Sequence, residues 1–97
     1  MLNNRQKAQL KAHANSLKPL GQIGKEGLSI NLLEFLDTAL ESHELIKIKV
    51  LNTCSMELNE LKIEIIRYLS ADLVQTIGRI LVLYRPNKEK KRIKLVK

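Results

Sequence analysis

The sequence predicts a single compact α/β domain in which a mixed four-stranded sheet carries three packed helices. Three observations predict it: apolar residues recur at helical spacing in three segments, apolar or alternating runs fill four shorter segments, and the few glycines and prolines fall between them. The expected order is α-β-α-β-α-β-β. Strand–helix–strand units favour parallel pairing through right-handed crossovers, and the last two strands favour a hairpin.

The first helix is expected over residues 4–16, where helix-forming residues dominate. Asn3 or Asn4 can cap its start, because a short polar side chain accepts a hydrogen bond from an unpaired backbone N–H. Pro19 disfavours helical backbone at the preceding residue, so the helix should end before Lys18.

A short extended piece over residues 20–23 leads into a second helix over residues 30–43, for which Ser29 is a candidate N-cap. The buried stripe of this helix consists of small and aliphatic residues: Leu32, Leu33, Leu36, Ala39 and Leu40. Beside it, acidic residues recur at steps of three and four: Glu34, Asp37, Glu41 and Glu44. We expect this acidic stripe to face solvent and nucleic acid to avoid it.

Further strands are indicated by alternating or continuous apolar runs over residues 45–51, 73–77 and 80–85. Between the first two of these a third helix is expected over residues 56–70, with Ser55 as its cap. Gly78 and Arg79 form a two-residue connection typical of a type II′ hairpin, which would leave Arg79 exposed in the turn. Residues 80–84 are apolar on both faces, so this strand should be central.

Composition limits the possible classes of protein. Ninety-seven residues make one domain, and 44% hydrophobic with 28% charged residues is an ordinary globular balance. No apolar run approaches the roughly 18–20 residues needed to span a bilayer, and the first residues lack an apolar signal core. Cys54 is the single cysteine, which excludes an intrachain disulfide and a cysteine-based metal site. A cytoplasmic protein is expected.

The net charge of +7 is concentrated at the two ends of the chain. Residues 1–25 hold five basic and no acidic residues, and residues 75–97 hold eight basic residues and one acidic residue. Residues 26–46 hold five acidic and no basic residues. This pattern predicts a polyanionic partner and, if the ends meet, one positive face. Residues 87–97 should form a basic, partly mobile tail that can dock through its apolar residues: Ile93, Leu95 and Val96.

A GxxG loop, Gly24-Lys25-Glu26-Gly27, lies directly before the second helix. Glycine lets a backbone approach a phosphate closely, and a helix start offers unpaired N–H groups and a partial positive charge. Lys25 adds a full charge. GxxG loops bind nucleic-acid backbones in KH domains, although the same pattern also occurs as a plain turn before a helix. It is not a Walker A loop, because no Gly-Lys-Ser/Thr follows.

Short blocks along nearly the whole chain carry a family resemblance. They are Gln6-Lys7, Leu10-Lys11, Leu17-Lys18-Pro19, Ile23-Gly24-Lys25-Glu26-Gly27-Leu28, His43-Glu44-Leu45-Ile46-Lys47-Ile48-Lys49, Val74-Gln75-Thr76-Ile77-Gly78 and Leu81-Val82-Leu83-Tyr84-Arg85-Pro86. In this order and at this spacing, the sequence resembles the YhbY family, the stand-alone bacterial form of the CRM (chloroplast RNA splicing and ribosome maturation) domain. Residues 52–72 match only as a helical pattern.

The resemblance implies a single CRM-type domain over residues 1–97, with a fold similar to the C-terminal domain of translation initiation factor three. It implies a non-catalytic RNA-binding protein that associates with precursors of the large ribosomal subunit and assists their assembly. It places the family's GxxG loop at Gly24–Gly27. We therefore expect ribosomal RNA as the partner, no membrane, no small-molecule substrate, no cofactor and a monomer.

The candidate RNA-contact residues are the loop and neighbouring cations: Gly24, Lys25, Glu26, Gly27, Lys7, Lys11, Lys18, Arg79 and Arg85. Secondary candidates are Lys47, Lys49, Tyr84 and Lys88. Each has a plainer interpretation. Lys7 and Lys11 can form a basic wall beside the loop or simply solubilise a helix. Arg85 can bind phosphate or cap a neighbouring element. Tyr84 can stack on a base or pack in the core.

Two other functions compete with RNA binding. A protein-interaction module would work through the acidic face of the second helix. An enzyme would need convergent titratable groups. His13 and His43 have no partner at metal-ligand spacing, and Cys54 has no evident base, so neither a catalytic residue nor a metal site is expected.

Overall fold

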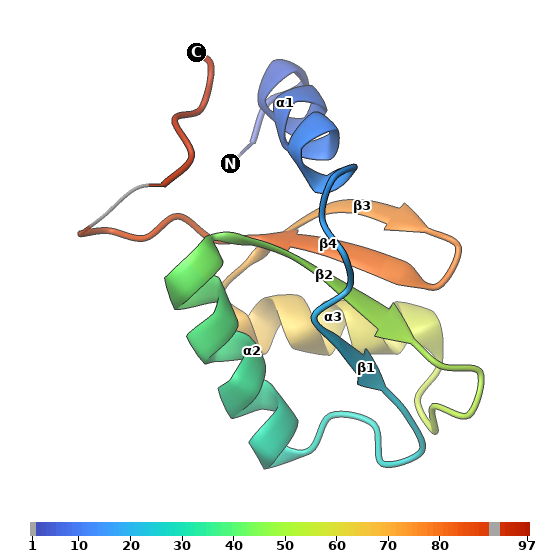
Figure 1. Ribbon diagram of the computed structural model, residues 1–97. Helices are drawn as coiled ribbons and strands as arrows, with labels where there is room; N and C mark the ends of the chain where they lie inside the picture. Colours follow the sequence, from blue (N-terminus) through green and yellow to red (C-terminus); the bar gives the residue numbers. More distant parts are fainter. Residues whose placement is uncertain (1, 90–91) are drawn as a thin grey trace.

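The computed structural model describes residues 2–89 and 92–97, and within them helices and strands follow the predicted order (Figure 1). Their bounds are α1 Asn4–Ala14, β1 Gly21–Ile23, α2 Ile30–His43, β2 Leu45–Val50, α3 Leu58–Leu69, β3 Asp72–Ile77 and β4 Ile80–Tyr84. The fold class predicted from the sequence, three helices on a mixed four-stranded sheet, is confirmed.

The sheet has the order β1-β2-β4-β3, with β1 and β2 parallel and the other neighbours antiparallel. The prediction that the last strand is central is confirmed, because β4 lies between β2 and β3. Of the two hairpin residues only Gly78 has a positive φ, 59°, as a type II′ turn requires. Because β4 lies between β2 and β3 in the sheet, the β2-α3-β3 connection passes over the position of β4.

The two faces of the sheet are covered differently (Figure 1). On one face α2 and α3 bury the main core, which includes Ile46, Ile48 and Val50 of β2. On the other face α1 covers a smaller cluster that includes Leu10, Leu45 and Tyr84, with Ile93 and Leu95 of the C-terminal segment packed against it. The alternation along β2 sends its isoleucines to the α2–α3 side and its lysines to the α1 side.

Three helix bounds differ from the prediction, namely the end of the first helix and both ends of the third, which ends at Leu69 rather than at residue 70. The first helix ends at Ala14 rather than at residue 16, because Ser16 and Leu17 turn more tightly and donate to carbonyls three residues back. The prediction that Ser55 caps the third helix is wrong. Glu57 is the N-cap, and its carboxylate accepts the Glu60 N–H while its charge favours the helix start.

The chain's two ends meet. Gln6 Nε2 donates to the Val96 carbonyl over 2.9 Å, and Gln9 pairs with the Lys94 carbonyl and the Val96 N–H, each over 2.8 Å. The C-terminal segment thus lies beside α1, which satisfies the condition for one continuous positive face.

The expectation that the acidic stripe faces solvent is wrong at its last residue, whereas Glu34, Asp37 and Glu41 are exposed as expected. Glu44 is completely buried and follows α2 with a φ of 63°. Its carboxylate accepts the backbone N–H groups of Asn87, Arg92 and Ile93. A buried carboxylate is stable only when its oxygens are hydrogen-bonded, and here the docked C-terminal segment supplies the donors.

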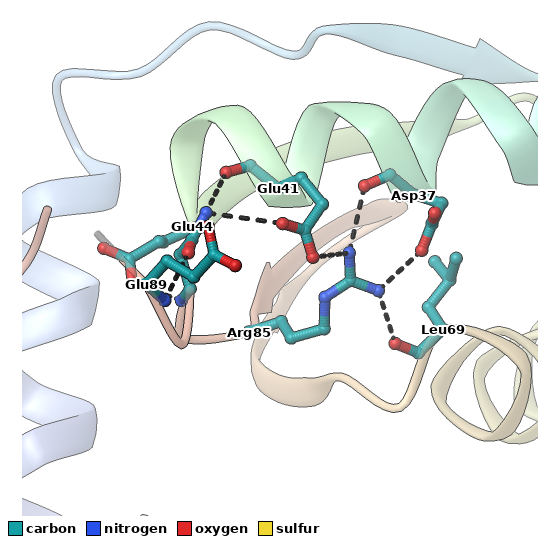
Figure 2. Close-up of polar contacts among 7 residues, drawn as sticks. Asp37, Glu41, Glu44, Leu69, Arg85 and Glu89 are labelled. Atoms are coloured by element: carbon teal, nitrogen blue, oxygen red, sulfur yellow. Dashed lines mark hydrogen bonds and ion pairs between the residues drawn. The ribbon is translucent and has the colours of Figure 1, made fainter. Parts of the chain in front are cut away.

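Arg85 contacts two other residues of that stripe, Asp37 and Glu41 (Figure 2). Its guanidinium donates to the Asp37 carboxylate over 2.8 Å, to the Leu69 carbonyl over 2.8 Å and to the Asp37 carbonyl over 3.0 Å. A longer contact, 3.4 Å, reaches Glu41. Arg85 therefore joins α2 to the end of α3, while the Asp37 and Glu41 side chains remain more than half exposed.

Candidate nucleic-acid interface

The GxxG loop forms a hydrogen-bonded turn at the edge of the sheet, between the end of β1 and the start of α2. The Gly27 N–H donates to the Gly24 carbonyl over 2.9 Å. Lys25 and Glu26 occupy the two central positions, both have negative φ as in a type I turn, and both side chains are exposed. The turn therefore presents one cation, one anion and its backbone to solvent.

The two glycines of the turn have different structural roles. Gly27 is buried, has a φ of 66°, and a Cβ there would lie 3.3 Å from Ser55 Oγ. This position requires glycine for the fold itself. A Cβ on Gly24 would meet only the Leu51 side chain at 3.5 Å, an ordinary contact, so the fold does not demand glycine there.

The helix start behind the turn faces the same solvent region. Ser29 caps α2 as predicted, and its Oγ accepts the Leu32 N–H over 3.1 Å. A shallow hollow of about 290 Å³ is lined by the turn together with Gln22, Ser29 and Leu32. The partial positive charge of a helix N-terminus favours an anion at such a place.

A strip of cations leads from this hollow along β2, on the side of the sheet that faces α1. The strand register places Gln22, which lines the hollow, directly beside Lys49. Lys49 is exposed, and Lys47 lies two residues away on the same strand face. Lys47 in turn lines a second pocket together with Lys18. We call the four lysines of this path, Lys18, Lys47, Lys49 and Lys25, the basic strip.

The structure does not bring the α1 lysines next to the turn. Lys7 and Lys11 lie on the helix that packs over β2 and β3, and Figure 1 shows α1 and the Gly24–Gly27 turn at opposite ends of the molecule. A basic wall beside the loop is therefore not formed by these two residues. Lys88, which is exposed after β4, belongs to the Arg85 region instead.

Three other sequence-predicted site residues are engaged in contacts within the protein: Arg79, Arg85 and Tyr84. Arg79 is half-buried rather than exposed, since its guanidinium donates to the Val50 carbonyl over 2.9 Å and the Leu51 carbonyl over 3.0 Å. Arg85 binds α2 and α3, with 16% of its side chain exposed. Tyr84 is a core residue, which rules out base stacking in this conformation. Burial, aided by the negative charges of Glu44 and Asp72, raises the pKa of Tyr84 above its usual 10.0.

Sequence reasoning listed Lys47 and Lys49 only as secondary candidates and did not name Gln22. The alternation of residues 45–51 showed that the two lysines share a face, but the pairing of β1 with β2 puts that face beside the turn.

In the part of the chain that the structure describes, no cluster of histidine, cysteine or carboxylate side chains could hold a metal ion. Within residues 2–89 and 92–97, no helix has the length and hydropathy that a membrane crossing requires.

Comparisons with known proteins agree with this architecture. The chain is 40% identical over 95 residues to a Bacillus subtilis protein named "Probable RNA-binding protein YqeI", covering 98% of this chain and 99% of the relative. It is 45% identical over 91 residues to a Haemophilus influenzae "RNA-binding protein", covering 93% and 91%. The solution structure of a hypothetical protein from Staphylococcus aureus superimposes with a TM-score of 0.73 at 39% identity, covering 99% of this chain and all of that one.

A family model decides the assignment. The model of the CRS1 / YhbY (CRM) domain matches residues 2–85, which contain every helix and strand described above. The match includes the turn, β1, β2 and the docked Arg85, so it covers the whole candidate interface. By sequence, by fold and by this match, the chain belongs to the CRS1/YhbY (CRM) domain family.

Proposed function

We propose that this protein binds single-stranded RNA through the RNA backbone, using the Gly24–Gly27 turn and the basic strip, and that it catalyses no reaction. The observation that carries the proposal is the path of cations from Lys18 across β2 to the turn, which the strand register assembles from three separate segments. The names of the relatives, two of which are called RNA-binding proteins, support the same ligand class.

The geometry favours backbone contacts over base readout along the strip. Lysine ammonium groups and backbone N–H groups at a helix start bind phosphate without regard to sequence. The chain has only three aromatic residues, and Tyr84 is buried, so an aromatic stacking platform like that of an RRM is absent from the described residues. Specificity would then come from RNA shape and from neighbouring molecules.

The salt dependence of binding tests this proposal. If about five phosphates on single-stranded RNA are neutralised, the affinity should fall roughly a hundredfold between 50 and 200 mM salt. A Lys25→Ala/Lys49→Ala variant should lower the slope of log affinity against log salt by about 1.4, because each lost phosphate contact contributes about 0.7. The measurement is fluorescence anisotropy with a labelled single-stranded RNA.

The matched control is Lys62→Ala/Arg67→Ala, which removes the same charge from α3 on the far side of the sheet. This control should keep the wild-type slope. Equal slopes for the two double variants would mean that only net charge matters and that the basic strip is not the binding site.

We further propose that the RNA is ribosomal RNA in precursors of the large ribosomal subunit, whose assembly the protein assists. The support is the sequence resemblance to the YhbY family. In sucrose gradients of cell lysate, the protein should sediment with large-subunit precursors. A Gly24→Asp/Lys25→Glu variant should remain at the top, whereas Asn59→Asp/Lys62→Glu, with the same charge change on α3, should sediment like wild type. If wild type also remains at the top, the assembly role is wrong.

A further inference from the structure

A pocket of about 450 Å³ lies at the other end of the basic strip from the turn. It is enclosed by the end of α1, the linker that follows, the end of α2, the start of β2 and the C-terminal segment. Lys47 Nζ donates to the Leu17 carbonyl over 3.1 Å and so ties the linker to β2 along the pocket wall. The pocket is therefore built by five segments and is of the size that small ligands occupy.

The lining combines two chemistries. Leu17, Leu20 and Leu45 supply apolar surface, and Leu17 and Leu20 are 37% and 43% exposed. Lysine and histidine side chains supply the polar part: Lys18, Lys47, His13 and His43. None of the lining residues is acidic. Exposed apolar surface beside cations fits a ligand with an apolar plane and an anionic group.

We propose that this pocket binds one unstacked nucleotide of the RNA strand, with the base against Leu17 and Leu20 and its phosphate near Lys18. This inference rests on the proposed function, because the strand reaches the pocket along the basic strip. Lys18 and Lys47 belong to both the basic strip and the pocket lining. An RNA backbone bound along the strip therefore reaches the pocket opening. RNA-binding proteins generally read bases that are splayed out of single strands, and a pocket of this kind accepts such a base.

The two histidines make the pocket observable. The chain contains only His13 and His43, and both line the pocket, so their imidazole proton NMR signals report on it alone. The probes are a tetramer of adenylate and an abasic ribose-phosphate tetramer of equal charge. The adenylate tetramer should shift both imidazole signals through the ring current of a bound base. The abasic tetramer should bind to the strip but cause much smaller shifts.

A pair of variants isolates the apolar wall. Leu17→Ser/Leu20→Ser changes two exposed side chains and should weaken adenylate-tetramer binding roughly tenfold, because the bound base loses apolar surface to pack against. Its affinity for the abasic tetramer should remain unchanged. The control, Ile30→Ser/Ile63→Ser, alters two exposed side chains on α2 and α3, 71% and 57% exposed, and should behave like wild type with both probes.

The outcomes separate the two proposals. If wild type binds neither tetramer, backbone binding fails and the pocket inference fails with it. If wild type binds both tetramers equally, with equal histidine shifts, RNA binding stands and the nucleotide pocket is overturned. Should the leucine variant lose its native circular dichroism spectrum, the comparison of the two tetramers on wild type alone still decides the question.

Discussion

The Arg85 guanidinium donates to carbonyl or carboxylate oxygens on both α2 and α3, so this residue joins three elements. An Arg85→Met variant keeps the aliphatic stem but leaves the Leu69 and Asp37 carbonyls without their donor. We expect it to lower the free energy of unfolding by about 2 kcal/mol, the usual net contribution of hydrogen bonds from a charged group. Urea denaturation measures this loss.

RNA affinity of the same variant distinguishes the structural role from a phosphate-binding role. Measured at low temperature, where the variant remains folded, the affinity should stay within about twofold of wild type if Arg85 contacts only protein groups. A tenfold loss of affinity with normal stability would return Arg85 to the RNA-contact residues.

Tyr84 gives the protein a predictable weakness at alkaline pH. Its pKa is raised, chiefly by burial, so the native state holds a proton that the unfolded state releases above about pH 10. The native state then binds more protons than the unfolded state, and stability must fall as the pH rises through this range. Tyr84→Phe lacks the phenol and should lose less stability between pH 8 and pH 11 than wild type, measured by urea midpoints at each pH. Parallel decline of both proteins would contradict this assignment.

At the scale of elements, the turn before α2 offers two substitutions that differ only in position. Gly27→Ala should lower the free energy of unfolding by about 1–2 kcal/mol, because a Cβ is strained at positive φ. Gly24→Ala should change it by less than about 0.5 kcal/mol, as for substitutions away from strained or buried features. The prediction is that Gly24→Ala nevertheless weakens RNA binding several-fold, since its Cβ would stand where a phosphate approaches the backbone. Thermal unfolding and anisotropy measure the two effects, and unchanged RNA affinity would show that the turn is only a connection.

The same elements show how far local sequence determines structure. Helix α2 was predicted with correct bounds, because Ser29 is the good cap directly before its apolar stripe. Helix α3 was predicted to start two residues early, because Ser55 and Glu57 both precede an apolar residue and local pattern does not decide between them. Ser55 instead lies beside Gly27, where a Cβ would come within 3.3 Å of its hydroxyl oxygen.

The tertiary structure of the whole molecule determines which charged side chains can contact a ligand. Sequence placed Lys25, Lys47 and Lys49 on a loop and a strand, but their continuity depends on the parallel pairing of β1 with β2. The sequence suggested Arg79 as an RNA contact because it was expected to be exposed in the hairpin turn, and Arg85 because it closes the last strand. Their acceptors lie 16 to 48 residues away along the chain, and no short-range pattern contains that information.

Glu44 and the C-terminal segment form one long-range unit, and the last prediction concerns their coupling. In the full chain, Glu44→Gln replaces one acceptor oxygen by an amide donor that faces backbone N–H groups, which should cost about 2 kcal/mol. In a chain that lacks residues 88–97, the Arg92 and Ile93 donors are gone, so the same substitution should cost about 1 kcal/mol less. Urea denaturation of the four proteins closes this double-mutant cycle, and Glu34→Gln, on the exposed side of α2, is the control.

An equal cost of Glu44→Gln in both chains would mean that Glu44 supports only the end of α2, where its own N–H donates to the Leu40 carbonyl. If the coupling is present, the docked segment also bears on RNA binding, because Ile93 forms part of the nucleotide pocket. The truncated chain should then bind the abasic tetramer normally while its histidine signals respond less to the adenylate tetramer. A truncated chain with the full wild-type response would separate the docking of the C-terminal segment from the pocket.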